Sequence, residues 1–266
     1  MSTPETREPL LRPLRRIGQI TTDCPFHYHK NDKDRFITVS SGKNFHTYNL
    51  EHLSTALVGP QFAGKIVSIC SNKDQVFTAS KNVIISWRKI HKIHTFGPVE
   101  EEILKIDILG DYLLALTEDQ LYCWNFHNAQ FVKKIALTIK AKLMTHPSTY
   151  LNKLLIAGQD GKLQLLNIKT EKVVYDFPEL SSRIFEEDTA DSITTIEESN
   201  VLDVVAIGTE FGSIHIVNLK TEETVMQFIQ TSAVTSLSFS SSNEVKAGFL
   251  ASGTTHGSFN IWNLNN

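Results

Sequence analysis

A short strand-like run that ends in an anchor residue recurs along the whole chain. All three tryptophans of the 266-residue sequence occupy this anchor position, and aromatic or aliphatic residues fill it in the other copies. The six anchors are Tyr48, Trp87, Trp124, Leu166, Val217 and Trp262. Asparagine follows five of them, and Arg88 follows the second. Successive anchors lie 37 to 51 residues apart, a period typical of proteins built from stacked repeats.

An apolar strand and a turn precede each anchor run. In the last three repeats, Gly161, Gly212 and Gly257 each stand six residues before the asparagine. A glycine at a constant place between two strands predicts a hairpin turn that needs positive φ. Alternating runs such as Lys65–Cys70 and Ala233–Phe239 supply a further, inner strand. Each repeat is therefore predicted to be an antiparallel unit of four strands.

Units of this length without helical periodicity are typical of β-propeller blades. One blade cannot bury both of its faces, whereas stacked blades bury them against each other. We therefore predict an all-β fold, a WD-repeat β-propeller with about six recognisable four-stranded blades. The anchors and glycines are then structural residues.

The predicted domains are a flexible tail that contains Arg and Pro over residues 1–18 and the propeller over residues 19–266. The sequence leaves two architectures open: a ring closed by six blades, and an incomplete ring of seven blades. We expect a fragment of a longer protein, with the closing blade beyond Asn266. The repeat also departs from the strong WD pattern, because Asn replaces Asp after the anchor and no Gly-His precedes it. A reduced buried hydrogen-bond network is expected.

Charge and cysteine content exclude several classes of protein. Lys and Arg number 26 against 29 Asp and Glu, which argues against binding nucleic acid mainly through a basic overall field. Cys24, Cys70 and Cys123 form no CxxC pair, so neither a disulfide framework nor a zinc-thiolate site is predicted and a reducing compartment fits best. The N-terminus has no apolar signal-peptide core, and no apolar stretch is long enough to span a membrane. We expect a soluble protein.

The segment from Gly59 to Lys65 spells the opening of a phosphate-binding loop. Ile66 follows it, where a Ser or Thr hydroxyl would be needed for Mg²⁺, and a strand-like run comes next in place of a helix. We therefore interpret this segment as a linker between blades, as we do Gly97-Pro98 at the next junction.

Histidine and acidic clusters give no site with a full set of ligands. His27 with His29, and His91 with His94, lack the further ligands of a metal site. The acidic runs 100–102 and 186–188 are interpreted as solvated loops, the second within an insertion around residues 179–191.

No catalytic, cofactor-binding or metal site is therefore nominated, no cofactor is expected, and the protein is predicted not to be an enzyme. A propeller hydrolase would need His and carboxylates converging on the inner strands. The inner strands that the sequence places, such as Val67–Cys70 and Val234–Phe239, show none.

Particular stretches resemble the WD repeat-containing protein 36 family, in its N-terminal propeller region. They are GKNFHTYNL (42–50), HPSTYLNKLL (146–155), GKLQLLNIKT (161–170) and VLDVVAIGT (201–209). The HPSTYLNK segment is not a general blade feature and carries most of the specificity. The resemblance covers residues 35–266, and the acidic insertion departs from it.

The resemblance implies a non-catalytic scaffold subunit of the small-subunit processome, acting in pre-18S rRNA processing and ribosome biogenesis in the nucleolus. Family members are longer, with two tandem propellers and a helical C-terminal domain. The implied partners are other WD-repeat processome proteins, including periodic tryptophan protein 2, and the pre-rRNA and guide small nucleolar RNA particle, contacted indirectly. The Arg-bearing segment 7–16 could reach RNA phosphate, and a solvated terminus is the alternative. An alternative function is a WD-repeat adaptor, such as a substrate receptor of a ubiquitin ligase, outside the nucleolus.

Overall fold

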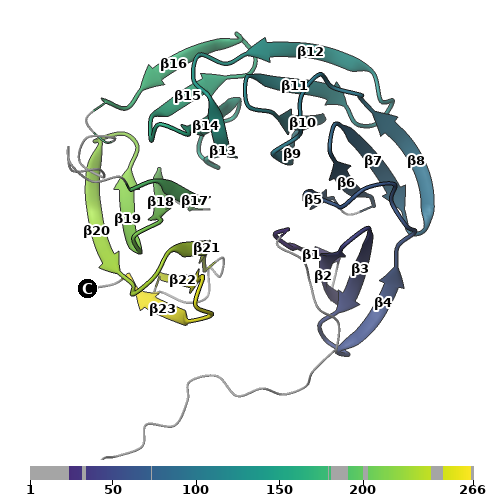
Figure 1. The fold of residues 1–266 in the computed structure, drawn as a ribbon, viewed down its shortest axis with the longest axis horizontal. Coiled ribbons are helices and arrows are strands. Elements are labelled where there is room, and N and C mark those ends of the chain that lie inside the picture. The colour runs from purple at the N-terminus through teal and green to yellow at the C-terminus, as the bar shows by residue number, and fades with distance from the viewer. Residues whose placement is uncertain are drawn as a thin grey trace, which may run out of the picture. The chain divides into compact units, whose positions relative to one another are not determined.

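The computed structural model describes residues 24–31, 34–72, 74–178, 180, 191–199, 203–240 and 248–264. The predicted tail over residues 1–18 and the acids at 186–188 lie outside this part. The chain divides into two compact units, Met1–His94 and Thr95–Asn266. Every regular element given below is a β-strand in an antiparallel sheet (Figure 1). Within the ranges described, no helix is long and apolar enough to cross a membrane.

The first unit holds the first two repeats, each folded as a four-stranded meander. The strands of the first sheet are β1 (His27–Asn31), β2 (Asp34–Ser41), β3 (Asn44–Asn49) and β4 (Ser54–Val58). Those of the second are β5 (Ser68–Ser71), β6 (Val76–Ser80), β7 (Val83–Arg88) and β8 (His91–Phe96), and the last two residues of β8 belong to the second unit. Phe45, Phe62, Ile66, Ile69 and Trp87 are buried together in the core of this unit.

The second unit holds the other four repeats. The third sheet contains β9 (Lys105–Leu109), β10 (Tyr112–Leu116), β11 (Gln120–Asn125) and β12 (Phe131–Ala136), and the fourth β13 (Ala141–Thr145), β14 (Lys153–Gly158), β15 (Leu163–Asn167) and β16 (Lys172–Asp176). The fifth contains β17 (Ile193–Glu198), β18 (Val204–Thr209), β19 (Ser213–Asn218) and β20 (Glu223–Ile229), and the sixth β21 (Val234–Phe239), β22 (Phe249–Thr254) and β23 (Phe259–Asn263). The six predicted repeats thus correspond one to one to six propeller blades. The sixth shows three strands, and no seventh sheet occurs, within the described residues.

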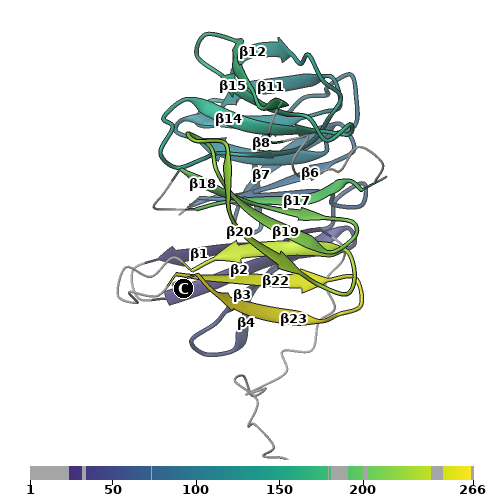
Figure 2. The ribbon, with the colours of Figure 1, turned by 90° about the vertical axis from the view of Figure 1, so that its left-hand side faces the viewer.

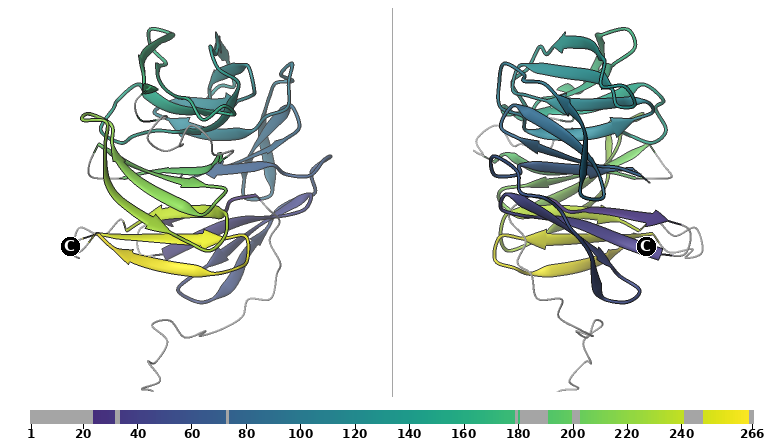
Figure 3. Two further views of the ribbon diagram at one scale, coloured as in Figure 1. Left: turned by 60° about the vertical axis from the view of Figure 1, so that its left-hand side comes forward. Right: turned by 90° about the vertical axis from the view of Figure 1, so that its right-hand side faces the viewer.

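Neighbouring blades of the second unit share apolar cores. The side-by-side packing of the fifth and sixth blades, green and yellow, is seen in Figures 2 and 3. Leu116 and Leu121 of the third blade pack with Met144 and Ile156 of the fourth, all fully or almost fully buried. Second strands such as β10 have apolar neighbours on both faces. Their sequences are accordingly continuous apolar runs and do not alternate with polar residues.

Each anchor lies on the third strand of its blade and pairs with the second strand. In the first, third, fourth and fifth blades the asparagine after it closes the next turn, since its side-chain oxygen accepts hydrogen bonds from backbone amides two or three residues on. The amides of Lys220 and Thr221, for example, bond to Asn218 Oδ1 at 2.8 and 3.3 Å. Four residues after the asparagine the chain takes a positive φ of 49° to 61°, at Leu53, Ala129, Glu171 and Glu222. The anchor asparagine is therefore a turn residue of the Asx type.

The second blade, where Arg88 replaces the asparagine, has a shorter turn between its third and fourth strands. Only Lys89 and Ile90 separate β7 from β8, and Lys89 has a φ of 56°. The sequence exception at Arg88 is thus a difference in turn length.

The predicted hairpin glycines lie between the second and third strands. Gly161, Gly212 and Gly257 have φ values of 77°, 93° and 77°, as expected. At Gly212 a Cβ atom would also lie 2.5 Å from the carbonyl oxygen of Gln230. No other residue fits this turn without displacing the backbone of the neighbouring loop.

Candidate functional site

The segment Gly59–Lys65 is a linker that lies along the first blade. Its flanking amides are occupied, because Gly59 N and Ile66 N donate to the carbonyls of Phe45 and Gly42 at 2.8 and 2.9 Å. A Cβ at Gly59 would lie 2.3 Å from the Phe45 ring. This glycine permits close packing, and the interpretation of the segment as a linker is confirmed.

The two histidines of β1 pack against β5. Their Nδ1 atoms lie 2.7 Å (His27) and 3.4 Å (His29) from Ser71 Oγ. Burial lowers the pKa of His27 to about 4, with a further contribution from His29, and burial also lowers the pKa of His29. Both rings are therefore neutral near pH 7. Over the residues described, no group of three or more His, Cys, Asp or Glu side chains could hold a metal ion.

Cys24, Cys70 and Cys123 are buried and form no disulfide with one another. Burial raises the pKa of Cys24 to about 11 and that of Cys123 to about 12. The thiolate is the nucleophilic form of cysteine, so these two thiols are packing residues at physiological pH.

A cluster of ionisable side chains joins the first strands of three blades in the second unit. Lys105 and Asp107 lie on β9, and Glu197 and Glu198 on β17. Lys105 Nζ donates to the carbonyl of Met144 on β13 at 2.9 Å, and the neighbouring Thr145 hydroxyl donates to the Glu198 carboxylate. We call Lys105, Asp107, Glu197 and Glu198 the first-strand cluster.

The carboxyl groups of this cluster are partly withdrawn from water. Burial raises the pKa of Glu197 to about 8, and the adjacent Glu198 raises it further while Lys105 opposes the shift. Burial also raises the pKa of Asp107, opposed by Lys105. Glu197 is thus largely protonated near neutral pH, which reduces its repulsion with the neighbouring carboxylates of Glu198 and Asp107.

The Thr145 hydroxyl, which is bonded to the first-strand cluster, is not accessible to a substrate. Thr145 is 3% exposed, so its bond to Glu198 attaches β13 to β17. The cluster can hold or release a proton as the pH changes, and we assign no catalytic step to it.

This cluster was not predicted from the sequence. The inner strands that could be placed from the sequence lack carboxylates. The first strands β9 and β17, which could not be placed, carry Asp107, Glu197 and Glu198. The available signal was the charged residues inside the otherwise apolar alternation at 103–109 and 193–198. Without the sheet order, these positions could not be told from loops.

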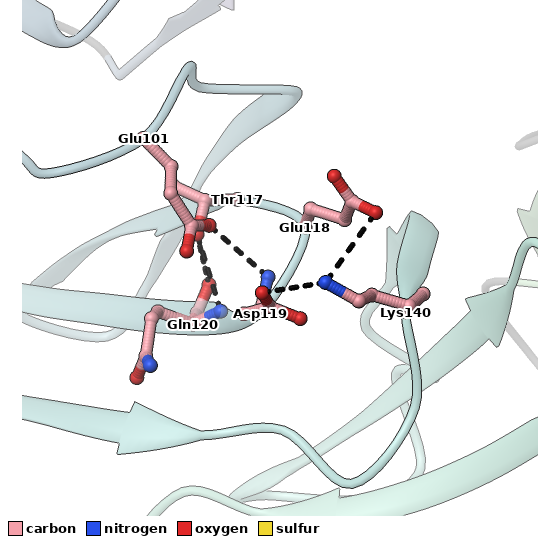
Figure 4. Close-up of polar contacts among 6 residues, drawn as sticks. All are labelled: Glu101, Thr117, Glu118, Asp119, Gln120 and Lys140. Atoms are coloured by element: carbon pink, nitrogen blue, oxygen red, sulfur yellow. Dashed lines mark hydrogen bonds and ion pairs between the residues drawn. The ribbon is translucent and has the colours of Figure 1, made fainter.

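The predicted acidic run 100–102 takes part in a polar contact among loops (Figure 4). Glu101 Oε2 accepts the backbone amide of Asp119, at the turn between β10 and β11, at 3.1 Å. Lys140, in the linker before β13, pairs with Asp119 at 2.7 Å and with Glu118 at 3.6 Å. One acid of this run therefore orders a turn.

The HPSTY segment, residues 146–150, lies between β13 and β14 of the fourth blade and forms hydrogen bonds to the fifth blade. Ser148 Oγ donates to the carbonyl of Ser199 at 3.0 Å, and the Thr149 hydroxyl donates to Asp203. Asp203 is also paired with Lys220. The segment that carried most of the family resemblance is thus an inter-blade contact.

Exposed apolar side chains lie on the fourth strands of the second unit. On β12, Phe131 is 52% exposed, and on β20 Val225 and Ile229 are 55% and 72% exposed. Val174 and Tyr175 on β16 are about half exposed. Apolar side chains repeated along outer strands suit contacts with other proteins.

A family model described as the WDR36/Utp21 first beta-propeller matches residues 37–266. The U3 small nucleolar RNA-associated protein 21 homolog of Schizosaccharomyces pombe is 31% identical, over 98% of this chain and 29% of its own length. WD repeat-containing protein 36 of Homo sapiens is 30% identical, over 97% of this chain and 28% of its own length. The chain therefore spans less than a third of these relatives.

Two solved structures share the fold at low sequence identity. BBS1N in complex with ARL6DN superimposes with a TM-score of 0.73 and 15% identity, over 93% of this chain and 80% of that one. The computationally designed Ika8 protein gives 0.64 and 12%, over 90% and 70%. With the blades, the HPSTY contact and the matched region considered together, the chain belongs to the WDR36/Utp21 family and corresponds to its first β-propeller.

Proposed function

We propose that this protein is a non-catalytic scaffold in ribosome biogenesis, acting in the small-subunit processome during pre-18S rRNA processing. The observation that carries the proposal is the family match over residues 37–266, because relatives in fission and budding yeast are named for association with U3 small nucleolar RNA. The proposed location is the nucleolus.

The surface of the second unit supports a role in protein contacts. Outer strands with exposed apolar residues offer areas that a partner can bury. The near-neutral charge suits protein partners better than extended contact with phosphates. We therefore propose other WD-repeat processome proteins, in a subcomplex with periodic tryptophan protein 2, as direct partners, and RNA as an indirect one.

The test is purification of the tagged chain from growing cells, followed by gradient sedimentation and probing for pre-rRNA and co-purifying WD-repeat proteins. We expect co-migration with large pre-ribosomal particles. Residence in light fractions without these partners would overturn the proposal and favour a WD-repeat adaptor outside the nucleolus.

A paired variant tests the outer-strand surface. Val225→Glu with Ile229→Glu places two charges on the exposed apolar positions of β20, and we expect loss of co-migration with the fold retained. Thr224→Glu with Gln227→Glu adds the same charge to exposed polar positions of this strand and is expected to leave co-migration unchanged. Unchanged co-migration of the Val225→Glu, Ile229→Glu pair would exclude these positions of β20 as a contact.

A further inference from the structure

The tryptophans of the second and sixth blades have a hydrogen-bond partner on the neighbouring strand. Trp87 Nε1 donates to Thr78 Oγ1 at 2.8 Å, and Trp262 Nε1 donates to Ser252 Oγ at 2.7 Å. In both blades the acceptor lies two residues beyond the residue that pairs with the tryptophan, Val76 in one and Leu250 in the other.

Trp124 of the third blade lacks this acceptor. It pairs with Leu113, and the residue two positions further is Ala115, which has no side-chain oxygen. Trp124 Nε1 has no hydrogen-bond partner in the described parts of the chain. Trp124 therefore occupies the same strand position as the other two tryptophans, but its indole N–H is not used as a donor.

A pocket of about 400 Å³ lies beside this tryptophan. Its aromatic lining is Trp124, Tyr122 and Phe131, with Tyr122 stacked at 5.8 Å on Trp124 and Phe131 edge-on to it at 5.9 Å. Pro98 and Val99 of the linker before β9 complete the apolar lining. The volume falls within the range of ligand pockets.

A second unused polar group belongs to the same lining. Tyr122 is 5% exposed, and its hydroxyl is buried without a hydrogen-bond partner among the described residues. Buried hydroxyls normally have a partner, and an unpaired one costs free energy. This hydroxyl is closed off from solvent, so the pocket combines apolar walls with a single donor for a ligand, Trp124 Nε1.

The charges at the pocket select the class of ligand. Glu100 and Lys134 line it and pair with each other at 3.1 Å, with the Glu100 side chain 74% exposed. Glu101 and Glu102 follow directly in the sequence. This acidic linker disfavours a phosphate backbone, so the aromatic lining is not suited to stacking with nucleic-acid bases.

We propose that this pocket docks an extended, proline-containing peptide segment of a protein partner. Polyproline II segments have no internal hydrogen bonds, so their carbonyls are free to accept, and they dock in grooves lined by aromatic residues. Trp124 Nε1 supplies the donor, and Phe131 with Pro98 supplies apolar contact. The proposal does not rest on the processome assignment.

The test follows the three indole N–H resonances of the ¹⁵N-labelled full chain by NMR, assigned with Trp→Phe variants. The probe is a decaproline peptide, with decauridine RNA as the second titrant. We expect a saturable shift of the Trp124 indole with the peptide alone. The indoles of Trp87 and Trp262, bonded internally, should stay in place.

Two variants and a control sharpen the result. Ala115→Ser supplies the missing acceptor, and we expect it to weaken peptide binding roughly three- to tenfold, the effect of one hydrogen bond. Phe131→Ala removes an exposed wall and should weaken binding by about tenfold or more. Phe259→Ala, at an exposed aromatic position of the sixth blade, should change nothing. An unshifted Trp124 indole, equal shifts of all three, or a shift with RNA alone would overturn the proposal.

Discussion

The third and sixth blades both carry tryptophan at the anchor, yet its surroundings differ. Trp262 stacks at 4.5 Å on Phe228 of the fifth blade and donates to Ser252. Trp124 is flanked edge-on by Phe96 and Phe131, and its N–H has no partner within the described residues. One repeat position can therefore serve a structural bond in one blade and a candidate binding surface in another, because neighbouring residues decide how the ring is used.

The two blades also differ at the edge and at the first strand. The third strand β11 is covered by β12, whereas no fourth strand is described beside β23. Leu121 of β11 is accordingly 0% exposed, and Phe259 at the matching place is 55% exposed. The first strand β9 carries Lys105 and Asp107, whereas β21 has no ionisable residue.

The largest expected contrast lies between Leu121→Ala and Phe259→Ala. Truncating the fully buried leucine leaves a cavity between blades and should lower the free energy of unfolding by about 2–5 kcal/mol. The phenylalanine variant should stay within about 0.5 kcal/mol of the parent. Urea denaturation measures both. A large loss at Phe259 would show that β23 is covered in solution.

The indole hydrogen bonds predict that Ser252→Ala lowers the free energy of unfolding and that Ala115→Ser raises it. Ser252 accepts from both Trp262 and the side-chain amide of Gln230, so its removal should cost about 1–3 kcal/mol. Ala115→Ser supplies an acceptor and should stabilise by up to about 1 kcal/mol. Thermal unfolding of both variants measures the difference. Losses of similar size would contradict the comparison.

The first strands of the third and sixth blades, β9 and β21, predict a difference in how stability depends on pH. Burial raises the pKa of Asp107 in the folded state, so the folded chain binds this proton more tightly than the unfolded chain. Stability from this group is therefore present below its ordinary pKa and falls as the pH rises above it. Asp107→Asn should flatten the fall of stability with pH, measured by denaturation midpoints, whereas Ser236→Ala on β21 should not.

A residual slope should remain in Asp107→Asn. The pKa of Glu197 moves from 4.5 to about 8 on folding, so its contribution declines between these pH values. An unchanged slope in Asp107→Asn would show that Asp107 is solvated.

The smallest expected effect concerns the turn after Trp124. Asn125 Oδ1 accepts the amides of His127 and Asn128 at 3.0 and 3.4 Å on an exposed surface. Asn125→Ala should cost about 0.5–1.5 kcal/mol, measured by urea unfolding. Asn125→Asp keeps the acceptor and is the matched control. An equal loss in both would mean that the turn does not depend on this oxygen.

Most of the fold could be predicted because the repeat is local. The anchors, the asparagines and the glycines at 161, 212 and 257 each report a short stretch of strand and turn, and all six blades follow from their spacing. The first-strand cluster could not be predicted, since Lys105, Asp107 and Glu197 come from strands far apart in the sequence. Their proximity depends on how blades stack.

The sequence by itself determined the blade pattern and the family, because strand alternation, turn residues and the HPSTY segment are read within a few neighbouring positions. Only the tertiary structure decided which polar groups have partners. The loss of an acceptor at Ala115, the unpaired hydroxyl of Tyr122 and the raised pKa of Glu197 each depend on atoms from another strand or blade. Hydrogen bonding and burial are set by distances in space, and those distances bring together residues that the sequence keeps apart.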